Sequence, residues 1–144
     1  MEMWELSARE RIRDTIARYN WAGDSGDADG LAETLCADGV LEIRGSEPLR
    51  GRTAIAAFLR GVAVARQPGV KPIVRHIVTN VLFAGLDRDT AHVSSYFTVL
   101  THVGLDHAGR YRDTLVRDGD TWLISHRKVS TDWAAPDSAM ARRR

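Results

Sequence analysis

Four long runs in which hydrophobic and polar residues alternate make up the second half of this 144-residue chain, at residues 74–85, 89–104, 109–119 and 121–133. Such alternation is typical of β-strands, because successive side chains of a strand point to opposite faces of its sheet. The connections GLDRD, GLDHAG and RDGD have the composition of tight turns. The second half is therefore expected to form an antiparallel meander of long strands.

The first half has a different spacing, with hydrophobic residues every three to four positions, as in amphipathic helices. Helices are expected at residues 7–22, about 28–35 and about 53–66, and a short strand at 39–44. Ser7 followed by Glu10 matches a capping box at the start of the first helix. Gly23 is a plausible end for that helix, and Asp27 is expected to cap the next one.

Helices followed by long strands predict an α+β fold. Long strands that coil around three helices should curl into a cone. We expect a cone-shaped α+β barrel, in which the three N-terminal helices pack on a strongly curved, mostly antiparallel sheet and enclose a cavity. Cavities of this kind bind small apolar ligands.

Strict alternation predicts which side chains share a face of each strand. One face of the 74–85 run should carry His76, Val78, Asn80 and Leu82. One face of the 109–119 run should carry Tyr111, Asp113 and Leu115. In the last run, Trp122, Ile124, His126 and Lys128 should stand opposite Leu123, Ser125, Arg127 and Val129.

The charge balance excludes strongly basic or acidic classes of protein. The chain has 20 basic and 19 acidic side chains and a net charge of +1, which gives no reason to expect nucleic acid or a membrane surface as partner. Neither a signal peptide nor an apolar membrane-spanning run is present in the sequence. Cys36 is the only cysteine, is expected in an apolar helical stretch, and cannot form an intramolecular disulfide. We expect a cytoplasmic protein with one domain at 1–133 and a flexible basic tail at 134–144.

The sequence contains no motif for a metal or nucleotide cofactor. The five histidines show no close ligand spacing, so no metal site is expected. No GxGxxG, GxxxxGK[ST] or GxSxG motif occurs, so neither phosphate binding nor acyl-enzyme chemistry is expected, and no cofactor is predicted. The remaining chemical equipment is of the acid–base type: Asp24, His76, Tyr19, Tyr96, Tyr111 and Asp113.

Several motifs in order resemble the SnoaL-like branch of the nuclear transport factor 2-like superfamily. They are Tyr19-x4-Asp24, Gly51 before the third helix, Arg75-His76-x3-Asn80, Gly109-Arg110-Tyr111-x-Asp113 and Gly119-x2-Trp122-x4-Arg127. That branch includes scytalone dehydratase, bile-acid 7α-dehydratase, lindane dehydrochlorinase and the β-subunits of ring-hydroxylating dioxygenases. The resemblance runs from about residue 8 to residue 133.

The resemblance implies roles for three residues. In the dehydratase and dehydrochlorinase members, an aspartate at the end of the first helix holds a histidine on the first long strand, and Asp24 and His76 match these positions. Tyr19 matches the tyrosine that polarises the substrate oxygen in the dehydratases. The second functional histidine of scytalone dehydratase lies on the next long strand, where neither His92 nor His102 aligns with it. We further expect substrate contacts from Trp21, Tyr96, Tyr111, Asn80 and Phe58.

These residues give the hypothesis of a cofactor-independent lyase or isomerase with His76 as general base. Asp24 would orient the imidazole and Tyr19 would donate to the developing oxyanion. The reaction would be dehydration, isomerisation or cyclisation of an apolar, polycyclic or polyketide-like compound, and relatives predict a homo-oligomer, either dimer or trimer. Alternatives are a capping role for Asp24, a core role for His76, and a pairing of Asp113 with Arg127 or Arg110. The alternative function is a non-catalytic binding or accessory subunit.

Overall fold

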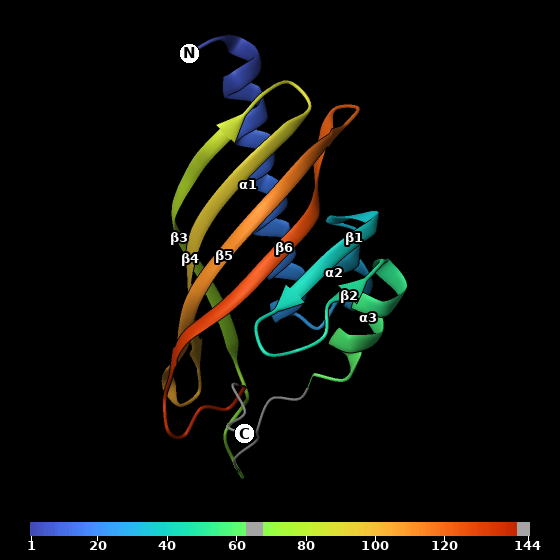
Figure 1. Cartoon of the computed structure of the whole chain (residues 1–144). Helices are drawn as coiled ribbons and strands as arrows, with labels where there is room; N and C mark the ends of the chain where they lie inside the picture. The colour runs from blue at the N-terminus through green and yellow to red at the C-terminus, as the bar shows by residue number, and fades with distance from the viewer. Residues whose placement is uncertain (63–67, 141–144) are drawn as a thin grey trace.

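The described residues fold into three helices and one curved six-stranded sheet (Figure 1). The computed structural model describes residues 1–62 and 68–140. The helices are α1 (Met3–Asp24), α2 (Ala28–Ala32) and α3 (Arg52–Arg60). The strands are β1 (Leu35–Ile43), β2 (Leu49–Arg50), β3 (Val74–Leu86), β4 (Thr90–Thr101), β5 (Gly104–Asp118) and β6 (Thr121–Ala134).

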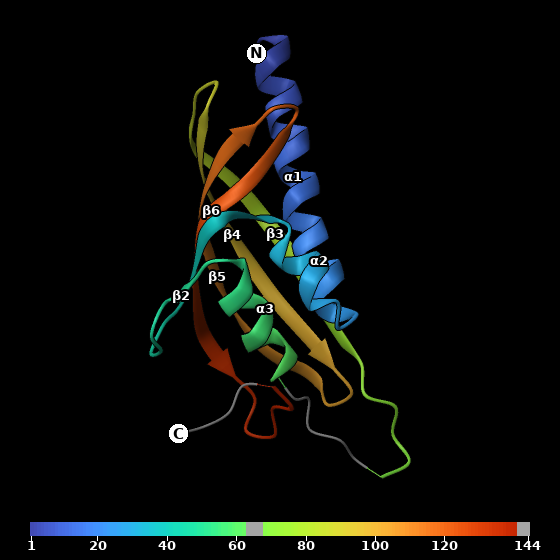
Figure 2. The same cartoon turned by 90° about the vertical axis from the view of Figure 1, so that its right-hand side faces the viewer.

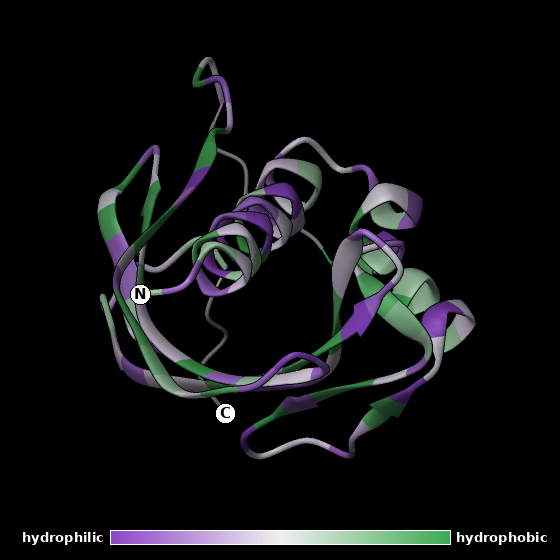
Figure 3. Ribbon diagram, turned by 90° about the horizontal axis from the view of Figure 1, so that it is seen from above, coloured by the Kyte–Doolittle hydropathy of each residue, from purple (hydrophilic) through white to green (hydrophobic). Residues whose placement is uncertain are grey.

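The sheet has the order β2-β1-β6-β5-β4-β3, and every neighbouring pair is antiparallel except β1 and β6, which are parallel. The strands β3 to β6 form the expected meander. Seen from above, the sheet curls around α1 without closing (Figure 3). The helices lie on its concave side (Figure 2). The predicted α+β fold with a curved sheet is confirmed.

A stripe of α1 forms the centre of the core. Ala8, Ile12 and Ile16 face the sheet and pack with Leu115 and Ile124 of β5 and β6 in one buried cluster. The helical spacing seen in the sequence produces this stripe, and each fully buried aliphatic side chain contributes roughly 1.5–3 kcal/mol. A separate buried cluster contains Phe97 and Val99 of β4 and Tyr111 of β5.

A bulge in β3 changes which residues face the core. Asn80 has a φ of 54°, and the pairing of β3 with β4 shifts register between Thr79 and Leu82. His76 and Val78 are partly buried before the bulge, whereas Val81 and Phe83 pack on the core after it. The prediction that Asn80 and Leu82 share the face of His76 is therefore wrong, because an extra residue reverses the alternation.

A second irregularity acts on β6. The register shifts between Thr114 and Leu115 of β5, so that Leu115 pairs with Ile124 but Thr114 pairs with His126. Ser125 is the extra residue, and Arg127 consequently joins Ile124 on the inner face, where it is fully buried. Strict alternation had placed Arg127 opposite Ile124, which is wrong for the same reason.

Local details of the first half also differ from prediction. Helix α1 already begins at Met3, so Ser7 lies inside it and does not cap it. Cys36 lies in β1, not in a helix. Helix α3 ends at Arg60, and residues 63–66 of the expected helix lie outside the described part of the chain. The cap by Asp27 is confirmed, since its side chain accepts a hydrogen bond from Gly30 N at 2.9 Å.

The segment after β6 folds back onto the sheet. Ala135 and Ala139 are buried, and Ala139 N donates to Asp106 Oδ2 at 2.7 Å. Residues 135–140, which the sequence assigned to a flexible tail, therefore make specific contacts. Among the residues described, no helix has both the length and the apolar character to cross a membrane.

Candidate functional site

The last residue of α1 and the second inner-facing residue of β3 form a bonded pair. Asp24 Oδ1 lies 2.6 Å from His76 Nδ1, and Asp24 Oδ2 accepts a second hydrogen bond from His76 N at 2.9 Å. Only 18% of the His76 side chain and 14% of the Asp24 side chain are exposed. Because Asp27 supplies the cap of α2, Asp24 is free to hold the imidazole.

The contact fixes the protonation pattern of the ring. A carboxylate only accepts hydrogen bonds, so His76 Nδ1 carries the donated proton. The other ring nitrogen, Nε2, has no hydrogen-bond partner among residues 1–62 and 68–140. A neutral imidazole held in this way presents a lone pair, and the carboxylate behind it stabilises the imidazolium that forms on protonation.

A pocket of about 490 Å³ lies between the end of α1 and the start of β3, in front of this pair. It is lined by Ala17, Asn20, Trp21, Asp24, Ser25, Arg75, His76 and Val78. Small-molecule sites have volumes of roughly 300–1,000 Å³, so the space is sufficient for a bicyclic compound. Trp21 is 79% exposed and stands at the rim, not in the core.

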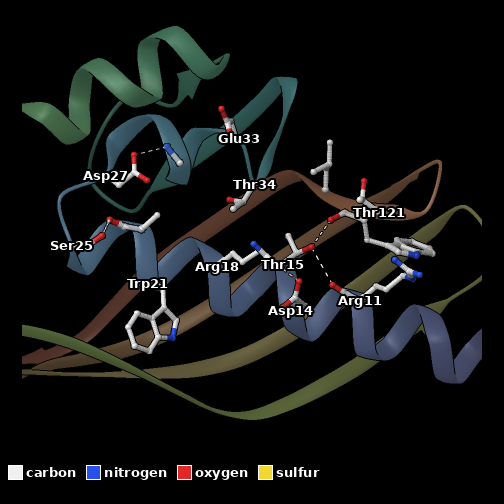
Figure 4. A pocket seen from close by; sticks show the side chains of 14 residues that line it. Arg11, Asp14, Thr15, Arg18, Trp21, Ser25, Asp27, Glu33, Thr34 and Thr121 are labelled. Carbon is white, nitrogen blue, oxygen red and sulfur yellow. Dashed lines mark hydrogen bonds and ion pairs between the residues drawn. The ribbon is translucent and has the colours of Figure 1, made fainter.

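A larger groove of about 800 Å³ lies between α1, α2 and the start of β6 (Figure 4). Its polar groups mostly bond one another: Arg18 Nε lies 2.7 Å from Asp14 Oδ2, and the Thr15 hydroxyl donates to Trp122 O at 2.6 Å. It shares Trp21 and Ser25 with the smaller pocket but contains no histidine. Of these two cavities, only the smaller pocket is lined by the Asp24–His76 pair.

A second charged pair, Arg127 and Asp113, is buried, and the Arg127 side chain lies between two tyrosines. Arg127 Nε and Nη2 each lie 2.8 Å from a carboxylate oxygen of Asp113, and both side chains are fully buried. The Arg127 guanidinium lies 4.2 Å from the ring centroid of Tyr19 and 3.8 Å from that of Tyr111. Of the two alternatives for Asp113, the structure selects Arg127, and Arg110 pairs with Asp132.

The buried tyrosines are kept protonated. Burial raises the pKa of Tyr19 and of Tyr111, although the nearby Arg127 acts to lower both. Burial alone would lower the pKa of Arg127, but the charge and hydrogen bonds of Asp113 together with the two tyrosines outweigh burial and raise that pKa. Tyr19 does not line the pocket of His76; a series of ring contacts through Tyr111 and Phe97 connects its ring to that of His76.

Asp106 and His107 form a second carboxylate–imidazole pair that the sequence analysis missed. His107 Nδ1 lies 2.6 Å from Asp106 Oδ1, and the ring centroids of His107 and His76 are 6.5 Å apart. The segment GLDHAG was interpreted as a turn, but β5 begins at Gly104. The signal was present in the spacing of His107 and Tyr111, which places both on the inner face.

The other residues predicted to contact the substrate lie outside the pocket of His76. Asn80 and Tyr96 share a groove on the convex face of the sheet, because the bulge in β3 and the alternation of β4 turn them away from His76. Tyr96 is 53% exposed there. Phe58 is half-exposed on α3, whereas Tyr111 packs with Phe97 and Val99 in a buried cluster and also lines the groove of Asn80 and Tyr96. The structure thus brings only Trp21 into the pocket of the dyad.

Among the described residues, no three His, Cys, Asp or Glu side chains come together in a way that could hold a metal ion. The three carboxylate–imidazole pairs of the described residues, Asp24–His76, Asp106–His107 and Glu42–His126, each join only one acid and one histidine.

Comparison with solved structures gives the same fold. An NTF2-like protein with a cystatin-like fold from Novosphingobium aromaticivorans is 28% identical, with a TM-score of 0.75 over 92% of this chain and 87% of that chain. A protein from the same organism, provisionally named a scytalone dehydratase, is 18% identical with a TM-score of 0.80 over 99% and 94% of the two chains. LinA is 18% identical with a TM-score of 0.78 over 98% of each chain. At 18% identity these last two show the fold alone.

No curated protein matches the sequence. The family model of the SnoaL-like domain, however, matches residues 4–128, which include both members of the Asp24–His76 pair. This protein belongs to the SnoaL-like domain family.

Proposed function

We propose that the protein is a cofactor-independent lyase or isomerase that removes a proton from a small apolar substrate. The observation that carries this proposal is the contact of 2.6 Å between Asp24 and His76 at the wall of a pocket of about 490 Å³. Membership of the SnoaL-like family supports it, as does the shared fold with LinA and with the protein provisionally named a scytalone dehydratase.

His76 is the general base in this mechanism. Its Nε2 takes a proton from a carbon next to a carbonyl group, and Asp24 stabilises the imidazolium. The electrons of the broken C–H bond then form a double bond. Either a leaving group departs from the β-carbon, which completes an elimination, or a proton returns at another carbon, which completes an isomerisation. General-base catalysis supplies about 10²–10⁴-fold, and positioning in the pocket supplies the rest.

Tyr19 has an indirect role in this proposal. Its phenol is buried against Arg127 and does not line the pocket, so direct donation to the substrate is not part of the mechanism. Tyr19 instead packs edge-on against Tyr111, with ring centroids 6.2 Å apart. It is therefore a positioning residue.

The function is tested by exchange of the α-protons of 2-tetralone, an apolar bicyclic ketone, in D2O. Exchange needs a base but no leaving group, so it reports proton abstraction from 2-tetralone whether the natural reaction is an elimination or an isomerisation. Wild type should accelerate the exchange, His76→Gln should lose at least a hundredfold of the rate, and Asp24→Asn should lose about tenfold or more.

His92→Gln is the matched control, because His92 is an exposed histidine on β4 away from the pocket. This variant should exchange 2-tetralone at the wild-type rate. A wild type no faster than His76→Gln would contradict the enzymatic function. If 2-tetralone still bound to the pocket in that case, the protein would be a binding module.

A further inference from the structure

Asn20 lies one helical turn before Asp24 on α1 and lines the same pocket as His76. It is only 6% exposed. Its Oδ1 accepts a hydrogen bond from the Tyr111 hydroxyl at 3.3 Å. Within residues 1–62 and 68–140, its Nδ2 finds no hydrogen-bond partner.

An unpartnered buried amide is unfavourable for folding. The great majority of buried polar side-chain atoms have a partner, since a donor that loses water and gains nothing destabilises the folded state. Asparagine is also a weak helix former, and leucine would fill the same helical position better. Asn20 therefore has a buried, unpartnered donor that stability does not explain, on a residue that lines the pocket of His76.

Other buried atoms without partners do not share this location. Arg127 Nη1 and Ser95 Oγ lie near Tyr111 but do not line the pocket of His76, and His102 Nδ1 and Arg9 Nε lie elsewhere. Asn20 alone among these five combines an unpartnered donor with a place in the wall of the pocket that holds the dyad.

We propose that Asn20 Nδ2 binds the carbonyl oxygen of the substrate and stabilises the enolate formed when His76 removes the neighbouring proton. The proposal rests on the proposed function and narrows the substrate class to apolar compounds with a carbonyl group next to the carbon that loses its proton. Asp24 and Asn20 would thus act from one face of one helix.

The step is balanced in atoms and electrons. The proton passes from carbon to His76 Nε2, the C–H electron pair forms the C=C bond, and the C=O π pair moves onto oxygen. The N–H of Asn20 donates to this oxygen, whose negative charge is greater in the transition state than in the bound ketone. A proton returned from the imidazolium to carbon or oxygen, or to a leaving group on the β-carbon, restores His76.

The catalytic part is tested with Asn20→Leu and the exchange of 2-tetralone. Loss of one oxyanion donor costs about 10²–10³-fold in kcat, and KM should change far less. Asn80→Gly is the control, because it removes an exposed amide on the convex face and should keep the wild-type rate. Wild-type kcat in Asn20→Leu would overturn the proposal.

Stability separates this role from a structural one. In Asn20→Leu with Tyr111→Phe, both ends of the hydrogen bond are replaced by apolar groups, so neither position 20 nor position 111 leaves a buried polar group unpaired. This double variant should melt at or above the wild-type temperature although its exchange is at least a hundredfold slower. A melting temperature clearly below that of wild type would assign Asn20 to the structure and overturn the proposal.

Binding distinguishes the failure of this inference from the failure of the proposed function. 2-Naphthol has the shape of the enol of 2-tetralone, and naphthalene lacks the oxygen. Asn20→Leu should lower the affinity for 2-naphthol at least tenfold, whereas the affinity for naphthalene should stay within about twofold of the wild-type value. Selective loss without any 2-tetralone exchange in wild type would retain Asn20 as an oxygen-binding residue and reject catalysis. Equal effects on both ligands would reject the role of Asn20.

Discussion

At the scale of single residues, Asp106 accepts more hydrogen bonds than any other carboxylate in the described part of the protein. Burial acts to raise its pKa, but donors from Ser138, His107, Ala139 and Thr101 outweigh burial and lower the pKa to about 2. Asp106 thereby joins the second imidazole to the segment that follows β6. The side chain of Asp106 is fully buried, and its bonds to Ser138 and Ala139 hold that segment against β5.

The lowered pKa predicts acid sensitivity. A depressed carboxylate pKa stabilises the fold above its unfolded value of 3.8, and this stabilisation is lost as the pH falls from about 4 towards about 2. The loss should amount to about 2 kcal/mol. Urea unfolding of wild type and Asp106→Asn over this range measures it; the variant should be less stable at pH 6 and should lack this part of the pH dependence. Asp132→Asn, which removes an exposed carboxylate, should keep it. If the free energy of unfolding of Asp106→Asn fell with pH as steeply as that of wild type, the lowered pKa of Asp106 would be contradicted.

The candidate site was only partly predictable from single residues. The meeting of Asp24 and His76 followed from the resemblance to relatives, because no local pattern links residues 52 positions apart. Asn20 and His107 were missed because their roles depend on spatial neighbours. Asn20 Nδ2 lacks a hydrogen-bond partner among the described residues, and His107 is held by Asp106. A free amide and a second carboxylate-held imidazole cannot be recognised from spacing alone.

At the scale of elements, periodicity predicted the helices and the meander but not the bulges. Helical spacing and alternation are local properties and survive folding. A bulge depends on the partner strand, and one extra residue exchanges the two faces beyond it. This is why Asn80 was placed beside His76 and Arg127 away from Ile124, both wrongly.

The bulge of β3 can be tested directly. Asn80 has a φ of 54°, in the left-handed region that β-branched residues avoid. Asn80→Val should therefore lower the free energy of unfolding by roughly 1–3 kcal/mol, whereas Asn80→Gly should be nearly neutral. Denaturant unfolding gives both values. Equal stability of the two variants would show that position 80 does not require this conformation.

At the scale of the whole molecule, the convex face of the sheet carries exposed apolar side chains. They are Ile77, Leu82, Tyr96, Leu100 and Leu105, of which Leu82 is 63% exposed. Contiguous apolar surface on a sheet is a common site of self-association. This supports the expectation of a homo-oligomer.

Light scattering after size-exclusion chromatography tests the expected assembly. Wild type should have a mass of two or three chains, and Leu82→Glu with Tyr96→Glu should reduce it to one. The far-ultraviolet circular dichroism should remain that of wild type, which shows that the change acts on association and not on folding. If wild type had the mass of a single chain, the expectation that the convex face is an interface between subunits would be wrong.

The central claim is that the imidazole held by Asp24 works as a base on a molecule in the adjoining pocket. The most direct measurement is the rate at which wild type and His76→Gln exchange the α-protons of 2-tetralone in D2O. We predict acceleration by wild type and a loss of at least a hundredfold in the variant. Equal rates for the two proteins would contradict the claim.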